Sequence, residues 1–582
     1  MKVLLNTHLL GTKFNAGTNS VRNVLKTSPY PMDSVSFSGN TGNKENRTTR
    51  EMIIDPDVAK TVANSLSTST SGHRAKYNTT YFNKDTVRLT AAAAGQYALE
   101  KASEDGRDRA KILIVRDTRP ESKEASDITV DTLMDMGNID IIELDEATPT
   151  PAGAAYAQEM DVDLAFLYSP SHNNWGDAGS NFMTKDAAIA PAGVTGEIGK
   201  KMIKIAEEQQ YEVNPEGVST KVIHSAYDVY KNKLESLGLI DYDAIANAGI
   251  SIYYDGLKGT GENYVPVLLD DYGIEHTIIN SGDKPGPNPI EDNLKELKSA
   301  VANDSNSSKI GLTTDGDADR FGFIDSDGAF ISPNDVIKLI GYHLAENKGI
   351  KGDFIRSQGT TSSIDIIGEK YGVNTLQTPV GFKYIAEDII DLRKEGKDIL
   401  VAGEESGGLT VHGHIPEKDG IVALMIMLDL LAAEKLKAGR AVSLTEILEN
   451  IDKDLGAVVK NVAVSQKLSD ETGEKDKKAI LERTELLLDD AAFGFHKNNY
   501  FPYDINVEKS ADVAREMEEY RKGGDGVKLY FNDTSSRSSV LVRASGTEPK
   551  IKAYIEAIGS TKEEAEKTYK NLKAGVDKLF TV

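Results

Sequence analysis

Cysteine is absent from all 582 residues of this chain. Its absence excludes disulfide bonds, thiolate zinc sites and cysteine nucleophiles, and it favours a reducing, cytoplasmic location. Long apolar runs are absent too. None approaches the ~18 consecutive apolar residues that a membrane span needs, and the apolar stretch after Lys2 is too short for a secretory signal. We therefore expect a soluble cytoplasmic protein with no membrane partner.

Positive charge is in short supply. Lys and Arg total 67 against 91 Asp and Glu, which leaves a formal net charge of −24. Such a charge repels nucleic acid and anionic membranes at long range, so neither is expected as a partner. An anionic small molecule would need a local basic pocket. At roughly 150 residues per domain, the length predicts about four domains.

A strand that ends in a serine-containing loop is the first feature with chemical meaning. The apolar run Leu164–Tyr168 is followed at once by a polar loop that contains Pro170, Ser171 and His172. The run is typical of a buried strand and Pro170 enforces a loop, so Ser171 is expected at the tip of a parallel sheet. The glycines that flank an esterase nucleophile are missing, which argues against acyl transfer. Taken alone, the serine and histidine could equally be ordinary turn residues.

Three aspartates at alternating positions follow another predicted strand. Ile310–Thr314 runs directly into a loop that holds Asp315, Asp317 and Asp319. Clustered carboxylates repel one another unless a cation lies among them, and a few oxygen ligands favour Mg²⁺. A calcium EF-hand does not fit, because the twelfth loop position is not glutamate. An aspartyl phosphatase usually has Thr or Val where Asp319 stands, and a solvated acidic turn remains an alternative.

Two later turns offer groups suited to a sugar. Lys383 lies at the predicted start of a helix, whose positive end makes this lysine usable as a proton carrier. The predicted strand Ile399–Ala402 ends in a glycine-rich turn, where Glu404 and Ser406 present an acceptor and a hydroxyl to sugar hydroxyls. By composition alone, either turn could be an ordinary surface turn.

Two further turns could hold a phosphate. The small-residue stretch Ser69–Arg74 ends in a cation, and a turn between two predicted strands combines Arg543 with Ser545, Gly546 and Thr547. A guanidinium with hydroxyls and backbone N–H groups can cradle a phosphate. Each turn alone competes evenly with a polar surface loop.

Predicted strands alternate with predicted helices through most of the chain, which indicates parallel strands joined by crossover helices. From about residue 466 this alternation ends, and the pattern there predicts a small α+β domain. The polar residues before 59 show weak periodicity, apart from a helix expected near Pro56–Leu66.

Together, these loops resemble those of the α-D-phosphohexomutase superfamily, whose members carry a phosphoserine loop, a three-aspartate metal loop, a sugar loop and a C-terminal phosphate loop in this order. Within it, Ser71–Arg74, Pro170–Asn173 and the turn 403–408 look like those of glucose-specific phosphoglucomutases. The resemblance implies three related mixed α/β domains (59–225, 226–335 and 336–465) and a C-terminal α+β domain (466–582) around a central cleft, after an N-terminal extension (1–58).

The resemblance also implies roles for individual residues. The implied catalytic residues are Ser171, His172, Lys383 and Arg74; the metal ligands Asp315, Asp317, Asp319 and Ser171; and the substrate-binding residues Arg320, Glu404, Ser406, Arg543, Ser545, Gly546 and Thr547. Ser171 would be phosphorylated beside Mg²⁺, and glucose 1-phosphate and glucose 6-phosphate would interconvert through glucose 1,6-bisphosphate, which also serves as activator. The expected partner is a small sugar phosphate, and the chain a monomer or dimer.

The chain departs from the family pattern at three positions: Ala75, Asn174 and Asn181 stand where glycine, proline and often a lysine are usual. These departures affect the serine loop and one proton-transfer role. Three alternatives therefore stand beside a phosphoglucomutase: a mutase for mannose or another sugar phosphate, a sugar-phosphate binding protein that has lost catalysis, and a magnesium phosphatase.

Overall fold

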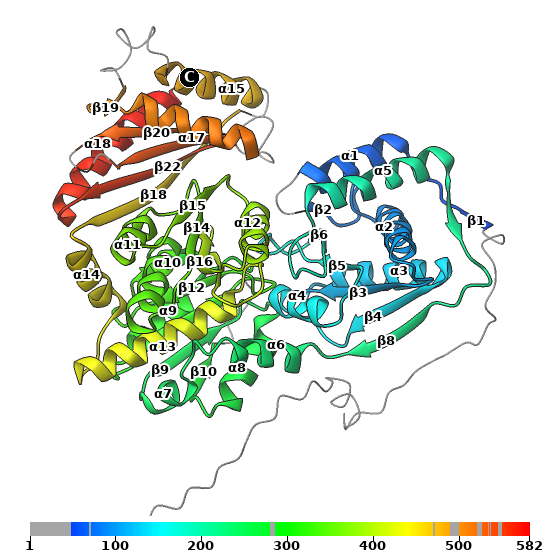
Figure 1. Ribbon diagram of the computed structural model, residues 1–582, viewed down its shortest axis with the longest axis horizontal. Coiled ribbons are helices and arrows are strands. Elements are labelled where there is room, and N and C mark those ends of the chain that lie inside the picture. Colours follow the sequence, from blue (N-terminus) through cyan, green and yellow to red (C-terminus); the bar gives the residue numbers. More distant parts are fainter. Residues whose placement is uncertain are drawn as a thin grey trace, which may run out of the picture.

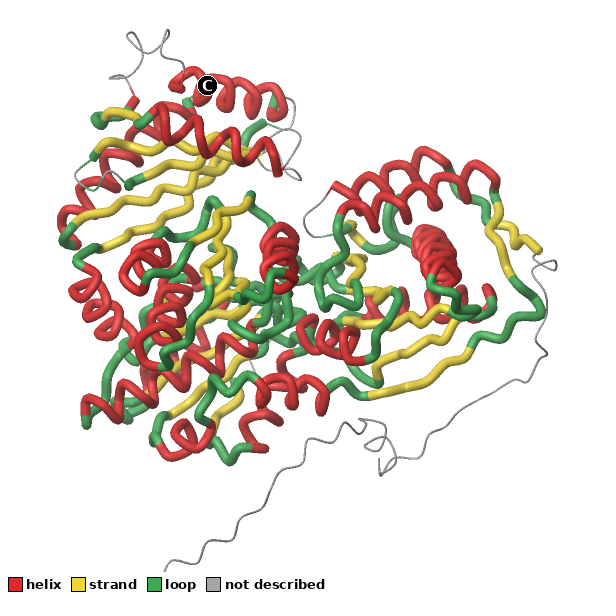
Figure 2. The backbone as a smooth tube through the Cα atoms, viewed as in Figure 1, coloured by secondary structure: helices red, strands yellow, loops and turns green. Residues whose placement is uncertain are grey.

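The computed structural model of the chain describes residues 48–68, 72–279, 286–469, 472–488, 500–520, 526–533, 535, 537–544 and 550–581. In this described part, the first sheet with its helices forms one lobe, and three further sheets are arranged beside it (Figures 1 and 2). Among the described residues, no helix has both the length and the apolar character needed to cross a membrane.

The first sheet has six strands in the order β2-β6-β5-β3-β4-β8. Its strands are β2 (His73–Lys76), β3 (Ala110–Arg116), β4 (Ile139–Leu144), β5 (Leu164–Tyr168), β6 (Asp177–Met183) and β8 (Thr220–His224). Its helices are α1 (Pro56–Thr68), α2 (Lys84–Glu104), α3 (Pro120–Met136), α4 (Thr150–Glu159) and α5 (Ala192–Glu208). A separate ribbon pairs β1 (Thr48–Glu51) with β7 (Gln210–Val213), so the chain joins this lobe before residue 58, where the extension was predicted to end.

The second and third sheets lie in the other part of the molecule (Figure 1). The second contains β9 (Ser251–Asp255), β10 (His276–Ile278), β11 (Lys309–Thr314), β12 (Phe321–Ile324) and β13 (Phe330–Ile331), with helices α6 (Tyr227–Ser236), α7 (Tyr242–Asn247), α8 (Gly261–Asp271) and α9 (Lys295–Asn303). The third contains β14 (Asp353–Ser357), β15 (Thr375–Thr378), β16 (Ile399–Glu404) and β17 (Gly408–Val411), with helices α10 (Pro333–Tyr342), α11 (Ser363–Tyr371), α12 (Phe382–Lys394), α13 (Gly420–Ala438) and α14 (Leu444–Leu455).

The three sheets share one strand order, which confirms the predicted relation between them. The shared sets are β4-β3-β5-β6, β10-β9-β11-β12 and β15-β14-β16-β17. In each set the first three strands are parallel and the fourth is antiparallel to the third. The loop between the third and fourth strands carries Ser171 in the first set, the three aspartates in the second, and the glycine-rich turn in the third. One repeated topology therefore supplies three functional loops.

Helix α13 packs in the core beside the second and third sheets, and its first residue lies against the aspartate loop. It is buried from Gly420 through Ala432, and this part is apolar except for Asp429, as expected for a helix inside a core. Asp419 caps its first turn by accepting from the N–H groups of Ile421 and Val422. A Cβ at Gly420 would lie 2.4 Å from Arg320 O, so only glycine permits this close approach.

The C-terminal sheet is antiparallel, with the order β18-β22-β21-β20-β19. Its elements are β18 (Val458–Lys467), β19 (Asp504–Ile505), β20 (Gly526–Asn532), β21 (Ser539–Ala544) and β22 (Lys550–Gly559), with helices α15 (Gly473–Glu485), α17 (Val507–Tyr520) and α18 (Lys562–Phe580). This is the predicted α+β domain, but the chain enters it earlier than residue 466, because β18 pairs with β22 from Val458 onward.

Candidate active site

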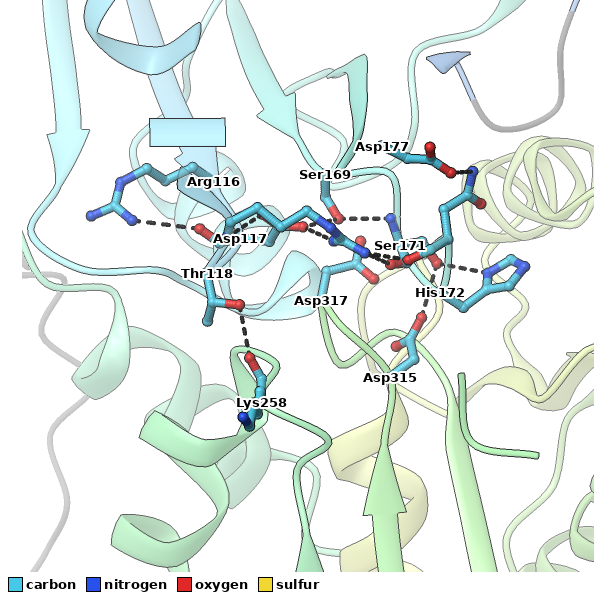
Figure 3. Close-up of polar contacts among 12 residues, drawn as sticks. Arg116, Asp117, Thr118, Ser169, Ser171, His172, Asp177, Lys258, Asp315 and Asp317 are labelled. Carbon is cyan, nitrogen blue, oxygen red and sulfur yellow. Dashed lines mark hydrogen bonds and ion pairs between the residues drawn. The ribbon is translucent and has the colours of Figure 1, made fainter. Parts of the chain in front are cut away.

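Ser171 lies between β5 and β6 and is 2% exposed. Its φ angle of 53° is in the left-handed region, where a residue other than glycine is held by its surroundings. The hydroxyl donates to Asp315 Oδ2 at 2.8 Å and lies 3.1 Å from His172 Nδ1. Figure 3 shows the Ser171 hydroxyl linked to Asp315, with Asp317 nearby and the His172 ring on another side of the hydroxyl. The predicted serine and aspartate loops therefore meet.

Asp315, Asp317 and Asp319 are buried and converge, with one carboxylate oxygen from each lying within 4.8 Å of the others. Burial, followed by the carboxylates of Asp319 and Asp317, raises the pKa of Asp315 well above its usual range. Burial and Asp319 raise the pKa of Asp317 to about 6. Within the described part of the chain, Asp317 Oδ1 and Asp319 Oδ1 are buried without a hydrogen-bond partner. Unpartnered, mutually repelling carboxylate oxygens fit a divalent cation.

Thr150, the first residue of helix α4 in the first lobe, is hydrogen-bonded to the aspartate loop. The N–H of Thr150 donates to Asp317 O at 2.9 Å, and its Oγ1 donates to Asp317 Oδ2 at 2.8 Å. The loop also approaches the serine loop closely, since a Cβ at Gly316 would lie 2.9 Å from Ser171 O. The distance between the seryl oxygen and the aspartates is thus set by packed backbone.

Two arginines balance the negative charge of the aspartates and connect the loops. Arg74 donates from Nη1 to Asn173 Oδ1 at 3.1 Å, and Arg320 donates from Nη1 to Ser406 O at 3.2 Å. The charge of Arg320, then burial, then the charge of Arg74 lower the pKa of His172 to about 2. The His172 ring beside Ser171 is therefore neutral at pH 7.

Lys418, which the sequence analysis did not single out, is the cation nearest the aspartates from the third sheet. Its Nζ lies 3.1 Å from Asp319 Oδ2 and 2.7 Å from Glu417 Oε1. Burial alone would lower its pKa, but the carboxylates of Asp319 and Glu417 raise it. Charged residues directly before an apolar buried helix were the available signal, because such charges must be paired.

The glycine-rich turn 403–408, which joins β16 to β17, contains Glu404 and Ser406. Glu404 is buried, accepts from Gly381 N at 2.7 Å, and has a pKa raised to about 7, first by burial and then by Glu405. In the described residues, Ser406 Oγ is buried with no partner. Lys383 lies on the first turn of α12, as predicted, with its Nζ 5.3 Å from the centre of the Tyr384 ring.

The C-terminal sheet brings two cations towards the same region. Arg543 at the end of β21 lies opposite Lys552 of β22. Lys552 is one of the charges that lower the pKa of His172. Burial and then Glu405 raise the pKa of Tyr554, whereas Arg543 lowers it. Like charges directly opposite on neighbouring strands are destabilising. Lys552 was not predicted.

Ser545, Gly546 and Thr547 of the predicted phosphate turn lie outside the described residues, as does Ser71 of the turn before Arg74.

Asn181, where a lysine was expected, is buried on β6 and accepts from the N–H of Phe182 at 2.9 Å. Lys185 is a nearby lysine, in the loop that follows β6. Its side chain is 60% exposed and lies 3.7 Å from Asp161. The cationic groups around Ser171 therefore come from other loops.

This arrangement of four domains with a buried serine beside three aspartates can be compared with known protein families. Phosphoglucomutase/phosphomannomutase alpha/beta/alpha domains I, II and III match residues 65–209, 228–328 and 332–454, and the C-terminal domain of the same family matches residues 505–570. The chain belongs to this family and is an enzyme of the isomerase class that transfers phosphate within the molecule.

Named relatives carry several sugar specificities. A phosphoglucosamine mutase of Lactobacillus helveticus is 27% identical over 511 residues, covering 84% of this chain and 96% of that protein. A phosphoglucomutase/phosphomannomutase of Thermococcus kodakarensis is 26% identical over 465 residues, covering 78% and 87%. The crystal structure of parafusin (phosphoglucomutase) from Paramecium in its open form has a TM-score of 0.70 at 19% identity, covering 92% of this chain and 98% of that chain, and shows the same fold.

Proposed function

We propose that this enzyme is a phosphoglucomutase that interconverts glucose 1-phosphate and glucose 6-phosphate through a phosphoserine at Ser171. The observation that carries the proposal is the 2.8 Å contact between Ser171 Oγ and Asp315 Oδ2. It puts a hydroxyl against a buried carboxylate cluster that fits a cation. Phosphoryl transfer needs such positioning and charge stabilisation more than any special covalent chemistry from the protein.

Asp315, Asp317 and Asp319, with an oxygen at Ser171, would hold Mg²⁺. When bound, Mg²⁺ supplies positive charge that offsets the charge of the phosphoryl group. Arg320 and Arg74 add positive charge from the metal-loop and first-lobe sides. His172 is uncharged at pH 7, so it acts as a hydrogen-bonding neighbour of the seryl oxygen rather than as a cation.

The reaction proceeds in two transfers. In the first, the C6 hydroxyl of glucose 1-phosphate attacks the phosphorus on Ser171, the bond from phosphorus to Oγ breaks, and Lys383 accepts the hydroxyl proton. Glucose 1,6-bisphosphate then reorients within the cleft, so that its C1 phosphate lies at Ser171. In the second, Ser171 Oγ attacks the phosphorus at C1, the bond from that phosphorus to the C1 oxygen breaks, and a proton returns to this oxygen. Glucose 6-phosphate leaves with Ser171 phosphorylated again, and added glucose 1,6-bisphosphate acts as activator by restoring this phosphoserine.

Two phosphate-binding ends are required because the sugar binds in both orientations. The phosphate at Ser171 is one end. For the other we propose Arg543, with Ser545, Gly546 and Thr547, and we add Lys552 because it lies opposite Arg543. Glu404 and Ser406 would hold the sugar hydroxyls between them.

Glucosamine phosphate is a second candidate substrate, for two reasons. The relative from L. helveticus, which covers 84% of this chain, is named a phosphoglucosamine mutase. In addition, the carboxylate of Glu404 could pair with an ammonium group as well as accept from a hydroxyl. Comparing kcat/KM for glucose, mannose and glucosamine phosphates decides between these substrates.

The test of the proposal is a mutase assay of the wild-type enzyme and Ser171→Ala with Mg²⁺ and glucose 1,6-bisphosphate. We expect isomerisation by the wild type only, and a phosphate mass on Ser171 after incubation with the bisphosphate. Steady release of inorganic phosphate would instead identify a phosphatase. Sugar-phosphate binding without turnover or phosphoserine would identify a binding protein.

A further inference from the structure

We infer that Arg119, acting through Asp117 and Ser169, positions the phosphoryl-carrying oxygen of Ser171. The inference rests on the proposed role of Ser171. Arg119 is the N-cap residue that directly precedes helix α3, whose first residue is Pro120. In the structure its guanidinium contacts the backbone of the serine loop. Among the described residues, it makes no hydrogen bond to the three aspartates of the aspartate loop or to the glycine-rich turn.

Arg119 holds the carbonyl side of the serine loop. Its side chain is 1% exposed, and its Nη2 donates to Ser171 O at 3.0 Å and to Asn173 O at 2.6 Å. Asp117, which is fully buried, pairs with Arg119 Nη1 and also accepts from Arg119 N at 3.0 Å. The planar guanidinium thus joins one carboxylate to two backbone carbonyls in a fixed orientation.

Ser169 holds the N–H side of the same residue. The N–H of Ser171 donates to Ser169 Oγ at 2.9 Å, and this hydroxyl donates to Asp117 Oδ2 at 3.1 Å. Figure 3 shows Ser169 and Asp117 on the side of Ser171 that faces away from Asp315. Both main-chain polar groups of Ser171 are therefore tied, through Ser169 and Arg119, to the single carboxylate of Asp117.

This arrangement accounts for the backbone angle of Ser171. A serine in the left-handed region, at φ 53°, persists only where surrounding contacts outweigh the local preference. Contacts at both the N–H and the C=O supply that constraint. If they are lost, the backbone can relax, and Oγ then moves relative to Asp315, from which it is now 2.8 Å distant.

The same arginine also contacts the metal loop and the chain's tryptophan. A Cβ at Gly316 would lie 3.3 Å from Arg119 Nη1, so the arginine packs directly against the aspartate loop. The guanidinium lies 5.0 Å from the centre of the Trp175 ring. A buried ion pair is seldom the most stabilising choice, and apolar residues often serve stability as well. An arginine that fixes two carbonyls is better explained by geometry at Ser171.

The test compares Arg119→Lys and Ser169→Ala with the wild type and with a matched control, Arg109→Lys. Arg109 lies in the same domain, pairs with Asp140 and donates to Val218 O at 2.5 Å, but has no contact with the serine loop. Lysine keeps the charge but has no planar fork that holds two carbonyls and a carboxylate in a fixed orientation. We expect Arg119→Lys to lower kcat about 100-fold and Ser169→Ala about tenfold, with KM for glucose 1-phosphate within about threefold of the wild type. Trp175 emission should shift in Arg119→Lys, and Arg109→Lys should behave as wild type.

Several outcomes would overturn the inference. One is an unchanged kcat in a folded Arg119→Lys; another is a loss that appears in KM alone. If Arg119→Lys does not fold, as judged by circular dichroism, Ser169→Ala decides, and a wild-type kcat for that variant overturns the inference. If the wild type shows no isomerisation, the proposed function fails. The rate of phosphate incorporation at Ser171 from glucose 1,6-bisphosphate then decides, and equal rates, or none, in wild type and Arg119→Lys overturn the inference.

Discussion

Ser171 and Asp315 are 144 positions apart in the chain, yet the serine hydroxyl donates to the aspartate carboxylate at 2.8 Å. They come from the same kind of loop in two sheets of the same strand order. The glycine-rich turn of the third sheet is linked to this contact through Arg320, which donates from its N–H to Asp315 Oδ1 at 3.1 Å and from Nη1 to Ser406 O at 3.2 Å.

Removing the seryl oxygen should abolish turnover while leaving the fold intact. Ser171→Ala deletes one hydrogen bond to Asp315, worth about 1 kcal/mol of stability, so the melting temperature should change little. Isomerisation should fall by at least about 10³-fold, because no phosphoryl carrier remains. Ser126→Ala is the matched control, since Ser126 Oγ is buried and has no partner among the described residues. Retained activity in Ser171→Ala would contradict the proposed mechanism.

Protons should compete with Mg²⁺ at the aspartate loop. The pKa of Asp317 is raised to about 6 and that of Asp315 well above its usual range. Folding therefore favours their protonated forms, so the metal-free protein should lose stability as pH rises from about 4 through about 6. Bound Mg²⁺ should offset this loss. We expect Mg²⁺ to raise the melting temperature more at pH 7.5 than at pH 5.5, as measured by calorimetry.

A substitution series checks the assignment of the ligands. Asp317→Asn should weaken Mg²⁺ binding at least about 100-fold, as measured by titration calorimetry. Asp327→Asn, at the hairpin turn beyond the loop, should leave the affinity unchanged, because Asp327 only accepts from Ala329 N. Equal affinities for the two variants would place the cation elsewhere.

Glu404 should give the reaction a pH dependence near neutrality. Its pKa is raised to about 7, so the carboxylate, which we propose accepts from sugar hydroxyls, is populated above that pH and lost below it. We expect kcat/KM to rise between pH 6 and 8, and Glu404→Gln to lower kcat/KM and remove this rise. Glu146→Gln is the control, because burial also raises the pKa of Glu146, which lies outside the site. A Glu404→Gln profile identical to that of the wild type would exclude this role.

Lys383 and Lys418 can be separated as proton carriers. Lys383→Met should lower kcat about 10²-fold with little change in KM if it accepts the hydroxyl proton. Lys418→Met should instead weaken Mg²⁺ binding or lower the stability of the protein. It removes the cation that lies 2.7 Å from Oε1 of buried Glu417 and 3.1 Å from Asp319 Oδ2. Rate assays and metal titrations on both variants test the assignment. A normal kcat in Lys383→Met with a loss in Lys418→Met at saturating Mg²⁺ would transfer the proton role to Lys418.

Trp175 should report the phosphorylation state of Ser171. It is the chain's one tryptophan, and its ring lies 5.0 Å from the guanidinium that holds Ser171 O. A phosphate on Ser171 adds negative charge close to this pair, so its emission should change when glucose 1,6-bisphosphate is added. Ser171→Ala should show no such change on phosphoryl transfer. A flat response in an active wild-type enzyme would contradict the placement of the ring.

The loops that follow buried apolar strands were predictable from the sequence. β5 is an apolar run, and β11 is a short run with Ile310 and Leu312 at its centre; both end at polar clusters, so Ser171 and the aspartates were placed at strand ends without any structure. β6 was not predicted, because the run from Asp177 to Met183 mixes small and polar residues and is buried only through its neighbours in the sheet.

Arg119, Lys418 and Lys552 were missed for a common physical reason. Arg119 and Lys418 contact groups distant in sequence, the serine loop and Asp319 respectively, and Lys552 is placed opposite Arg543 only by the pairing of two strands. Sequence patterns report local periodicity, and they do not show which surface cations become enclosed when domains meet. The aspartate cluster was found because its members are neighbours in the chain.

The two hydrogen bonds that Thr150 makes to Asp317, at 2.9 and 2.8 Å, join a helix of the first lobe to the loop that gathers the cation's ligands. Separating the first lobe from the part of the molecule that contains the second sheet would therefore distort the cation site. By linkage, a bound cation should oppose this separation. The Mg²⁺ concentration would then determine whether the two parts unfold in one thermal transition or in two. The ion would therefore have a structural role as well as a role in the chemistry.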